Sequence, residues 1–333
     1  MLKYKWMCVA VLCCAMFAAC EPTEVASDQN PISFGSGRKQ ALINTINARL
    51  WGYTTGTNSY WVFAGDTEDG LTEGENAEYI ESSKTLTPNV IRYWANNQFY
   101  NFYSVWPVVD GNGISDIAFN KTNSQLSFKA DIANQNGNTD FCIAAALDEK
   151  GDADRKDAVP MTYKHALSKV QFYGFSSTTG TTAKLTNFTI TVPKSATVLC
   201  TLIEDTKADK KDAEGNITTA YPLDITYTLG AETAQLSSTG EFDLQDNITN
   251  ANGIKVLEKL VLPMQDGTFH VEATYKIGDN TKTVKTDIEA TWLPGKNYIY
   301  KFYIQPSGPI IFEVVKVEPW DNVSNELTFD VES

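Results

Sequence analysis

Short runs of β-branched and aromatic residues recur along almost the whole chain, and clusters of glycine, asparagine and aspartate separate them. Runs of this kind are typical of β-strands, and turn signals at this spacing are typical of β-sandwiches. We therefore predict strands over residues 50–54, 60–63, 99–105, 126–130, 141–147, 169–175, 184–192, 223–229, 255–262, 269–277, 283–290 and 298–304. The chain is expected to be all-β, with few helices.

One stretch stays undecided, because Leu42, Ile46 and Leu50 have the i, i+4, i+8 spacing of a helix and overlap the first predicted strand. A charged, glycine-containing stretch at 148–157 is typical of an exposed connection. With 333 residues, the chain is long enough for two domains. We predict two consecutive β-sandwich domains, over residues 32–158 and 159–333.

The N-terminus has the features of an export signal. Lys3 and Lys5 precede an apolar run at 6–19, which is too short at about 1.5 Å per residue to cross a hydrocarbon core about 30 Å thick. The small residues before Cys20 resemble a bacterial lipobox, in which the cysteine is acylated and the chain is cut before it. Residues 1–19 are thus predicted to be a lipoprotein signal peptide, Cys20 the lipidated residue and 20–31 a tether, with ordinary secretion as the alternative.

Cleavage at this point would leave Cys20, Cys142 and Cys200. If Cys20 carries the lipid, only one disulfide could form. We expect Cys142 and Cys200 to be two separate buried thiols instead.

The charge and the small number of histidines limit the chemistry. The chain has 41 acidic and 27 basic residues, a net charge of −14, which repels phosphate backbones and argues against a nucleic-acid partner. The two histidines, His165 and His270, lie far apart, and His165 is expected to make structural hydrogen bonds. The sequence predicts no catalytic residue, no cofactor and no metal site, although a glycosidase that uses a pair of carboxylates stays open.

Three stretches resemble the fimbrillin-like family of Bacteroidota, the lipoprotein subunits of type V pili. They are RYWANNQFYNFYSVWP at 92–107, VPMTYKHALSKVQF at 159–172 and WLPGKNYIYKF at 292–302. The second is the most specific, with Tyr163 in place of the family's usual phenylalanine. The resemblance implies transthyretin-like, Greek-key sandwiches and a non-enzymatic subunit of a cell-surface fimbrium, or an adhesin associated with a pilus.

The resemblance also implies polymerisation by donor-strand exchange. In this family a lipid-anchored precursor at the outer membrane loses its N-terminal strand to a trypsin-like or Arg-specific protease. A strand of the next subunit then fills the groove. The expected partners are therefore other pilus subunits or copies of the same chain, the outer membrane and the processing protease.

Particular residues fit each step. Ile32 and Phe34 share one face of the expected removable strand, Arg38 is the preferred cleavage site and Arg49 the second choice. The C-terminal residues 325–333 alternate as a donor strand would, with three apolar residues on one face: Leu327, Phe329 and Val331. The alternative is that this strand completes its own domain.

A second function stays open, that of a surface lipoprotein which binds glycans. In that hypothesis sugar rings would stack on Trp51, Trp61, Trp94 and Trp106. Aromatic residues of a β-sandwich belong to its core more often than to a binding surface.

Overall fold

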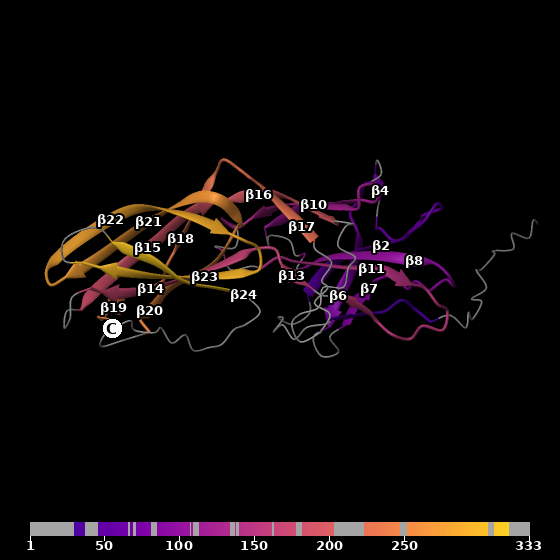
Figure 1. The fold of residues 1–333 in the computed structure, drawn as a ribbon, viewed down its shortest axis with the longest axis horizontal. Helices are drawn as coiled ribbons and strands as arrows, with labels where there is room; N and C mark the ends of the chain where they lie inside the picture. The colour runs from indigo at the N-terminus through magenta and orange to yellow at the C-terminus, as the bar shows by residue number, and fades with distance from the viewer. Residues whose placement is uncertain are drawn as a thin grey trace, which may run out of the picture.

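The computed structural model describes residues 30–36, 46–65, 67–68, 71–80, 85–106, 108, 113–133, 137, 140–161, 163–177, 182–202, 223–246, 252–305 and 310–319. These residues form strands, turns and connecting segments without an α-helix, so the all-β prediction is confirmed. The molecule is elongated, with the N-terminal strands at one end and the C-terminal strands at the other (Figure 1). Over the described ranges, no helix is long and apolar enough to cross a membrane.

A nine-stranded sheet dominates the N-terminal end. Its order is β12-β1-β7-β6-β2-β8-β11-β13, and β3 pairs with β2. The strands are β1 (Phe34–Ser36), β2 (Ile46–Thr54), β3 (Trp61–Phe63), β6 (Glu75–Ile80), β7 (Thr85–Pro88), β8 (Phe99–Trp106), β11 (Cys142–Lys150), β12 (Val159–Met161) and β13 (Lys164–His165). The stretch with undecided periodicity is thus a strand from Ile46 onward, because tertiary pairing with β6 and β8 fixes it.

A six-stranded sheet of order β17-β16-β10-β9-β5-β4 packs against it. Its strands are β4 (Thr67–Glu68), β5 (Leu71–Thr72), β9 (Ile114–Asn120), β10 (Gln125–Asp131), β16 (Ser195–Leu202) and β17 (Leu223–Leu229). The last two come from the second half of the sequence, and β16 pairs with the whole length of β10. Strands from both sides of the predicted domain boundary at residue 158 therefore share sheets, and the boundary itself stays a prediction.

Two further sheets form the C-terminal sandwich. One has the order β20-β14-β23-β24, and the other has the order β18-β15-β21-β22, with β19 paired to β15. Their strands are β14 (Ser168–Ser176), β15 (Ala183–Pro193), β18 (Thr233–Ser237), β19 (Phe242–Leu244), β20 (Ile254–Val261), β21 (Met264–Ile277), β22 (Asn280–Trp292), β23 (Lys296–Ile304) and β24 (Ile311–Pro319). Phe172 of β14 meets Phe188 of β15 at a ring-centroid distance of 5.2 Å, which joins the two layers.

Strand β8 is buried on both faces. Tyr103 and Val105 belong to the large core that continues into the C-terminal sandwich. Tyr100, Phe102 and Trp106 belong to a second core, which is built by the nine-stranded sheet and the segments beside it. This second core lies on one face of the sheet. The sheet therefore folds over on itself, so that β1 lies above β8.

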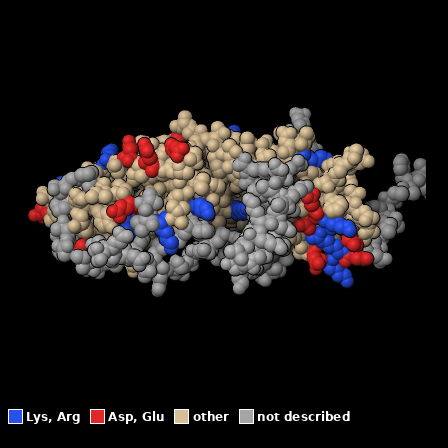
Figure 2. Space-filling view, viewed as in Figure 1, with Lys and Arg blue, Asp and Glu red and all other residues tan. Residues whose placement is uncertain are grey.

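The surface carries mixed charge. On the face drawn in Figure 2, acidic and basic side chains lie next to one another and gather at the N-terminal end of the molecule. Exposed ion pairs of the described residues include Lys129 with Asp116 at 2.6 Å and Lys184 with Glu241 at 2.6 Å. Pairs of this kind contribute little to stability.

Candidate functional site

Strand β1 is inserted between two strands that come later in the chain. It pairs in parallel with β12, where Phe34 lies opposite Val159, and antiparallel with β7, where Phe34 lies opposite Leu86. Both of its backbone edges are therefore hydrogen-bonded. The first strand of the fold is an internal member of the sheet.

The side chains of this segment are buried. Ile32 is 5% exposed and Phe34 is fully buried. The ring of Phe34 meets Phe63 and Phe102 edge-on, with centroids 5.7 and 5.1 Å apart. Gly52 makes room for these rings, because a Cβ atom at this position would lie 2.7 Å from the ring of Phe102. Burial of each apolar side chain contributes about 1.5–3 kcal/mol.

We call the space occupied by β1 the β1 slot. Its sides are the backbone edges of β7 and β12, and its floor consists of buried apolar side chains. These side chains are Phe63, Leu86, Phe102, Val159 and Met161. Without β1, the slot would present two unpaired strand edges and an apolar floor, which is the arrangement that accepts a strand from elsewhere.

The residues just before β1 are also hydrogen-bonded to the rest of the fold. The backbone N–H and the side-chain Nδ2 of Asn30 both donate to the carbonyl oxygen of Ala153, at 2.8 and 3.1 Å. The carbonyl oxygen of Asn30 accepts from Trp94 N–H at 3.3 Å, and Ile32 N–H donates to the carbonyl of Arg92 at 2.8 Å. Among the described residues, the anchored segment therefore includes Asn30 and Ile32 as well as β1.

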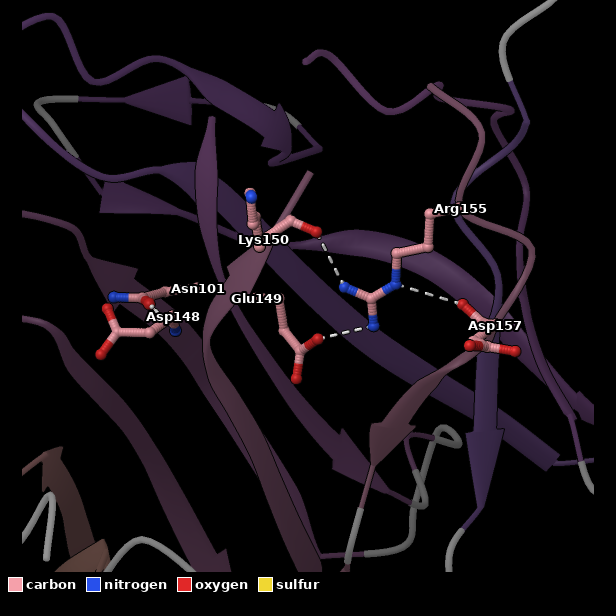
Figure 3. A network of polar contacts seen from close by, with 6 residues as sticks. All are labelled: Asn101, Asp148, Glu149, Lys150, Arg155 and Asp157. Carbon is pink, nitrogen blue, oxygen red and sulfur yellow. Dashed lines mark hydrogen bonds and ion pairs between the residues drawn. The ribbon is translucent and has the colours of Figure 1, made fainter. Parts of the chain in front are cut away.

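The segment 151–158 accepts the hydrogen bonds of Asn30 at Ala153. Arg155 of the same segment makes several polar contacts (Figure 3). The guanidinium donates to a carboxylate oxygen of Glu149 at 2.6 Å and to the carbonyls of Lys150 at 3.1 Å and Asp157 at 3.4 Å. It also lies 4.5 Å from the ring centroid of Trp94. The charged stretch predicted as an exposed connection therefore contains a structured clasp, which we call the Arg155 clasp.

Several predicted site residues lie outside the described residues. They are Cys20, Arg38, Leu327, Phe329 and Val331. Arg49, the second choice for cleavage, lies inside β2, opposite Asn76 of β6 and Val105 of β8. Its guanidinium donates to the side-chain oxygen of Asn76. The backbone around Arg49 is therefore paired on both sides.

The four tryptophans considered for sugar stacking are mostly core residues. Trp51, Trp94 and Trp106 are 0%, 1% and 7% exposed. Trp61 is partly buried, and the ammonium of Lys121 lies 5.2 Å from its ring centroid. Three of the four rings thus offer no open face to a sugar.

Sequence reasoning missed a polar cluster between β11 and β13. Cys142 and His165 lie opposite each other in the sheet, and Asp140 contacts both: its Oδ2 pairs with His165 Nδ1 and lies 3.2 Å from Cys142 Sγ. Zinc uses these ligand types, but zinc ligands lie more than about 3 Å apart, and the Asp140–His165 contact is of hydrogen-bond length. The contact between Asp140 and His165 joins β13 to the residue that precedes β11.

Both described cysteines are thiols. Cys142 and Cys200 are buried in different cores, and no disulfide joins them, as expected. Spacing along the chain could not reveal the cluster around Cys142, because it depends on the pairing of β11 with β13.

A cavity of about 620 Å³ lies beside β17. Its lining includes Tyr227, Leu229, Met264 and Leu293, and no charged side chain takes part. Burial raises the pKa of Tyr227 well above its ordinary value. The cavity therefore offers little to recognise a charged ligand.

The fold is all-β, and its strand β1 is buried between β7 and β12. A family model described as Fimbrillin-like matches residues 50–320. The chain belongs to the fimbrillin-like family. Membership supports a role as a pilus subunit or in adhesion at the cell surface, together with other pilus subunits, and gives no indication of an enzyme.

The chain is also similar to several solved structures. A protein of Bacteroides uniformis named for cell adhesion is 18% identical, with 90% of this chain and 100% of that chain covered and a TM-score of 0.49. A fimbrilin of Porphyromonas gingivalis is 10% identical over 88% and 98% of the two chains, with a TM-score of 0.40. A fimbrial assembly protein of Parabacteroides distasonis is 10% identical over 87% and 98%, with a TM-score of 0.39. No curated protein sequence matches the chain.

Proposed function

We propose that this protein is a structural subunit of a cell-surface fimbrium that polymerises when proteolysis removes β1 and a strand of another subunit enters the β1 slot. The observation that carries the proposal is the burial of Phe34 in β1, between β7 and β12 and against the rings of Phe63 and Phe102, together with the burial of Ile32 just before the strand. A precursor with Cys20 acylated would be held at the outer membrane until the cut releases it.

Covalent attachment explains why proteolysis would be the trigger. Only residues 37–45 join β1 to β2, and a short linker keeps an attached segment at an effective concentration in the millimolar range. A donor strand from another subunit cannot compete with β1 under that condition. Once the linker is cut, β1 is diluted into the surroundings and the slot becomes available.

We propose Arg38 as the cleavage site in preference to Arg49. A protease binds its substrate as an extended, accessible segment, and Arg49 lies within a strand paired on both edges. A cut after Arg38 would separate the whole of β1 from the fold and leave β2 complete.

The test is to treat the purified, full-length precursor with an Arg-specific protease. We expect release of the N-terminal fragment and the appearance of ladders that resist SDS without boiling. The Arg38→Ala variant should stay uncut and monomeric, whereas the matched variant Arg49→Ala should be cut and should polymerise. Monomers that persist after complete removal of β1 would contradict the proposed function.

A further inference from the structure

The polar cluster beside β11 and β13 brings three metal-ligating side chains together. Among the described residues, Asp140, Cys142 and His165 are the one group of three such side chains whose donor atoms all lie within 4.8 Å of one another. Cys142 and His165 are buried, and Asp140 is mostly buried. Thiolate, imidazole and carboxylate are the side-chain ligands that zinc binds in proteins, whereas magnesium and calcium prefer oxygen ligands alone. The cluster therefore has the composition of a zinc site.

Two of the three distances in the cluster already fit a zinc ion. Zinc bonds of about 2.3 Å to sulfur and about 2.0–2.1 Å to nitrogen and oxygen, at tetrahedral angles, place the donor atoms about 3.3–3.6 Å apart. Cys142 Sγ lies 3.2 Å from Asp140 Oδ2 and 3.8 Å from His165 Nδ1. The third pair, Asp140 Oδ2 and His165 Nδ1, is in hydrogen-bond contact without an ion, and these two atoms would have to separate by about 1 Å for an ion to enter.

Asp140 can provide this movement. It precedes β11 and is not part of the strand, so its side chain can turn without breaking the pairing of the sheet. Its second carboxylate oxygen, Oδ1, is buried and has no hydrogen-bond partner among the described residues. A buried acceptor that is left unpaired costs free energy. An ion between the three side chains would give this carboxylate the partner that it lacks.

The charges of the cluster balance when zinc is bound. The ion displaces two protons to the solvent, one from the Cys142 thiol and one from between Asp140 and His165. The thiolate and the carboxylate then carry two negative charges, which the two positive charges of the ion cancel, and His165 binds as a neutral imidazole through Nδ1. A neutral cluster avoids the high cost of an unpaired buried charge.

We propose that Asp140, Cys142 and His165 bind one zinc ion with a structural role, at the junction of the nine-stranded sheet and the C-terminal sandwich. Cys142 begins β11, and His165 ends β13, the last strand of that sheet along the chain before β14. In the elongated molecule, β13 lies near the middle (Figure 1). The spacing of residues in the sequence predicts no such site, because its ligands meet only through the pairing of β11 with β13.

The residues after His165 connect the cluster to the C-terminal sandwich. The backbone N–H of Ala166 donates to the carbonyl of Phe141 at 2.6 Å, and the carbonyl of Leu167 accepts from Gly295 N–H at 2.9 Å. The ion would therefore fix the start of β11 to the connection that leads from one end of the molecule to the other.

Metal binding to the full-length chain tests the site. The chain is stripped of metal with a chelator, separated from it and titrated with Zn²⁺ alone, or with Co²⁺, which absorbs light by charge transfer when a thiolate binds it. Four cysteines outside the described residues could also bind metal: Cys8, Cys13, Cys14 and Cys20. The site is therefore measured as the difference between the natural chain and Cys142→Ser. We expect a difference of one ion per chain and a stronger cobalt–thiolate absorption in the natural chain.

A second ligand variant and two matched controls locate the ion. His165→Gln should weaken zinc binding at this site by more than the roughly 10–100-fold that loss of an outer-shell partner of a metal ligand costs. Cys200→Ala removes the other buried thiol, and His270→Gln removes the exposed histidine that pairs with Asp287 at 2.5 Å. Both controls should bind zinc as the natural chain does. Zinc should raise the melting temperature of the natural chain and of the controls but not that of Cys142→Ser, because it binds the folded state.

Equal amounts of bound metal in the natural chain and in Cys142→Ser would overturn the zinc site. Equal losses of zinc affinity in His165→Gln and His270→Gln would do the same. If circular dichroism shows that Cys142→Ser does not fold, Asp140→Asn replaces it as the reference, since it keeps the size of the side chain and removes the carboxylate. None of these measurements depends on polymerisation, so they test the zinc site separately from the proposed function.

Discussion

Phe34 is the single side chain on which the stability of the uncut protein depends most at the β1 slot. It is fully buried and meets two other rings edge-on. Phe34→Ala should lower the free energy of unfolding of the precursor by about 3–5 kcal/mol, since it removes a buried aromatic side chain and leaves a cavity. Urea denaturation followed by tryptophan fluorescence would measure the loss.

Ser33→Ala provides the control for this variant. Ser33 is exposed and contributes its backbone carbonyl, which the substitution keeps. Its effect should stay within about 0.5 kcal/mol. Equal stability of the two variants would mean that β1 is not packed as described.

The lowered pKa of Glu258 predicts that the stability of the folded protein depends on pH. Burial acts to raise its pKa, but hydrogen bonds from Lys255, Gln171 and Lys169 outweigh this and lower the pKa to about 2. Because the pKa is lower in the folded protein, the carboxylate stabilises the fold above the ordinary pKa of glutamate. This stabilisation is lost as the pH falls towards 2.

At neutral pH, Glu258→Gln should be less stable than the natural protein by about 1–2 kcal/mol, a value reduced for solvent screening because the side chain is 36% exposed. The difference should shrink steadily between pH 4.5 and pH 2 in urea titrations. A difference that stays constant over this range would show that the carboxylate charge is not responsible.

Residue-level reasoning placed Ile32 and Phe34 on one face of a strand, and both are buried. It also expected a structural role for His165. It could not find Asp140 as the partner of His165, because the two meet only through the pairing of β11 and β13. A local pattern shows which side of a strand is apolar, but gives no partner across the sheet.

Among the structural elements, the Arg155 clasp should control how readily the N-terminal segment leaves the fold. Arg155→Ala removes the hydrogen bond to Glu149 and those to two carbonyls, and thereby loosens the segment that holds Asn30. A loss of about 1.5–3 kcal/mol corresponds to roughly 10–100-fold faster opening. Hydrogen exchange at the amides of Asn30 and Ile32 would measure it.

Lys156→Ala is the matched control, because Lys156 is the exposed neighbour of Arg155. Exchange at residues 30 and 32 should be unchanged in this variant. If both variants accelerate exchange equally, general loosening of the segment, and not the clasp, would be the cause.

All twelve predicted strand regions correspond to strands of the structure; the region 223–229 has the same bounds as β17, and the others differ from their strands at one or both ends. The strands that correspond to none of the twelve regions include β6, β9, β16 and β24. In β6 and β9 the exposed faces carry polar residues, such as Glu78 and Asp116, which weakens the local signal. These strands form because β2 and β10 supply their backbone partners.

For the whole molecule, the sequence alone predicted the fold class but not the arrangement of the sheets. The parallel pairing of β1 with β12 and the addition of β16 and β17 to β10 join segments far apart in the chain. No spacing or composition indicates such pairings. The predicted boundary at residue 158 followed composition, whereas the sheets combine strands from both sides of it.

The contact between Asn30 and Ala153 spans 123 residues of the chain. During synthesis and export, the segment that closes the slot emerges early, and the strand it must join emerges much later. Long-range pairing of this kind forms slowly, after local structure. We therefore expect the contact of the N-terminal segment with residue 153 to be a late step in the folding of each molecule.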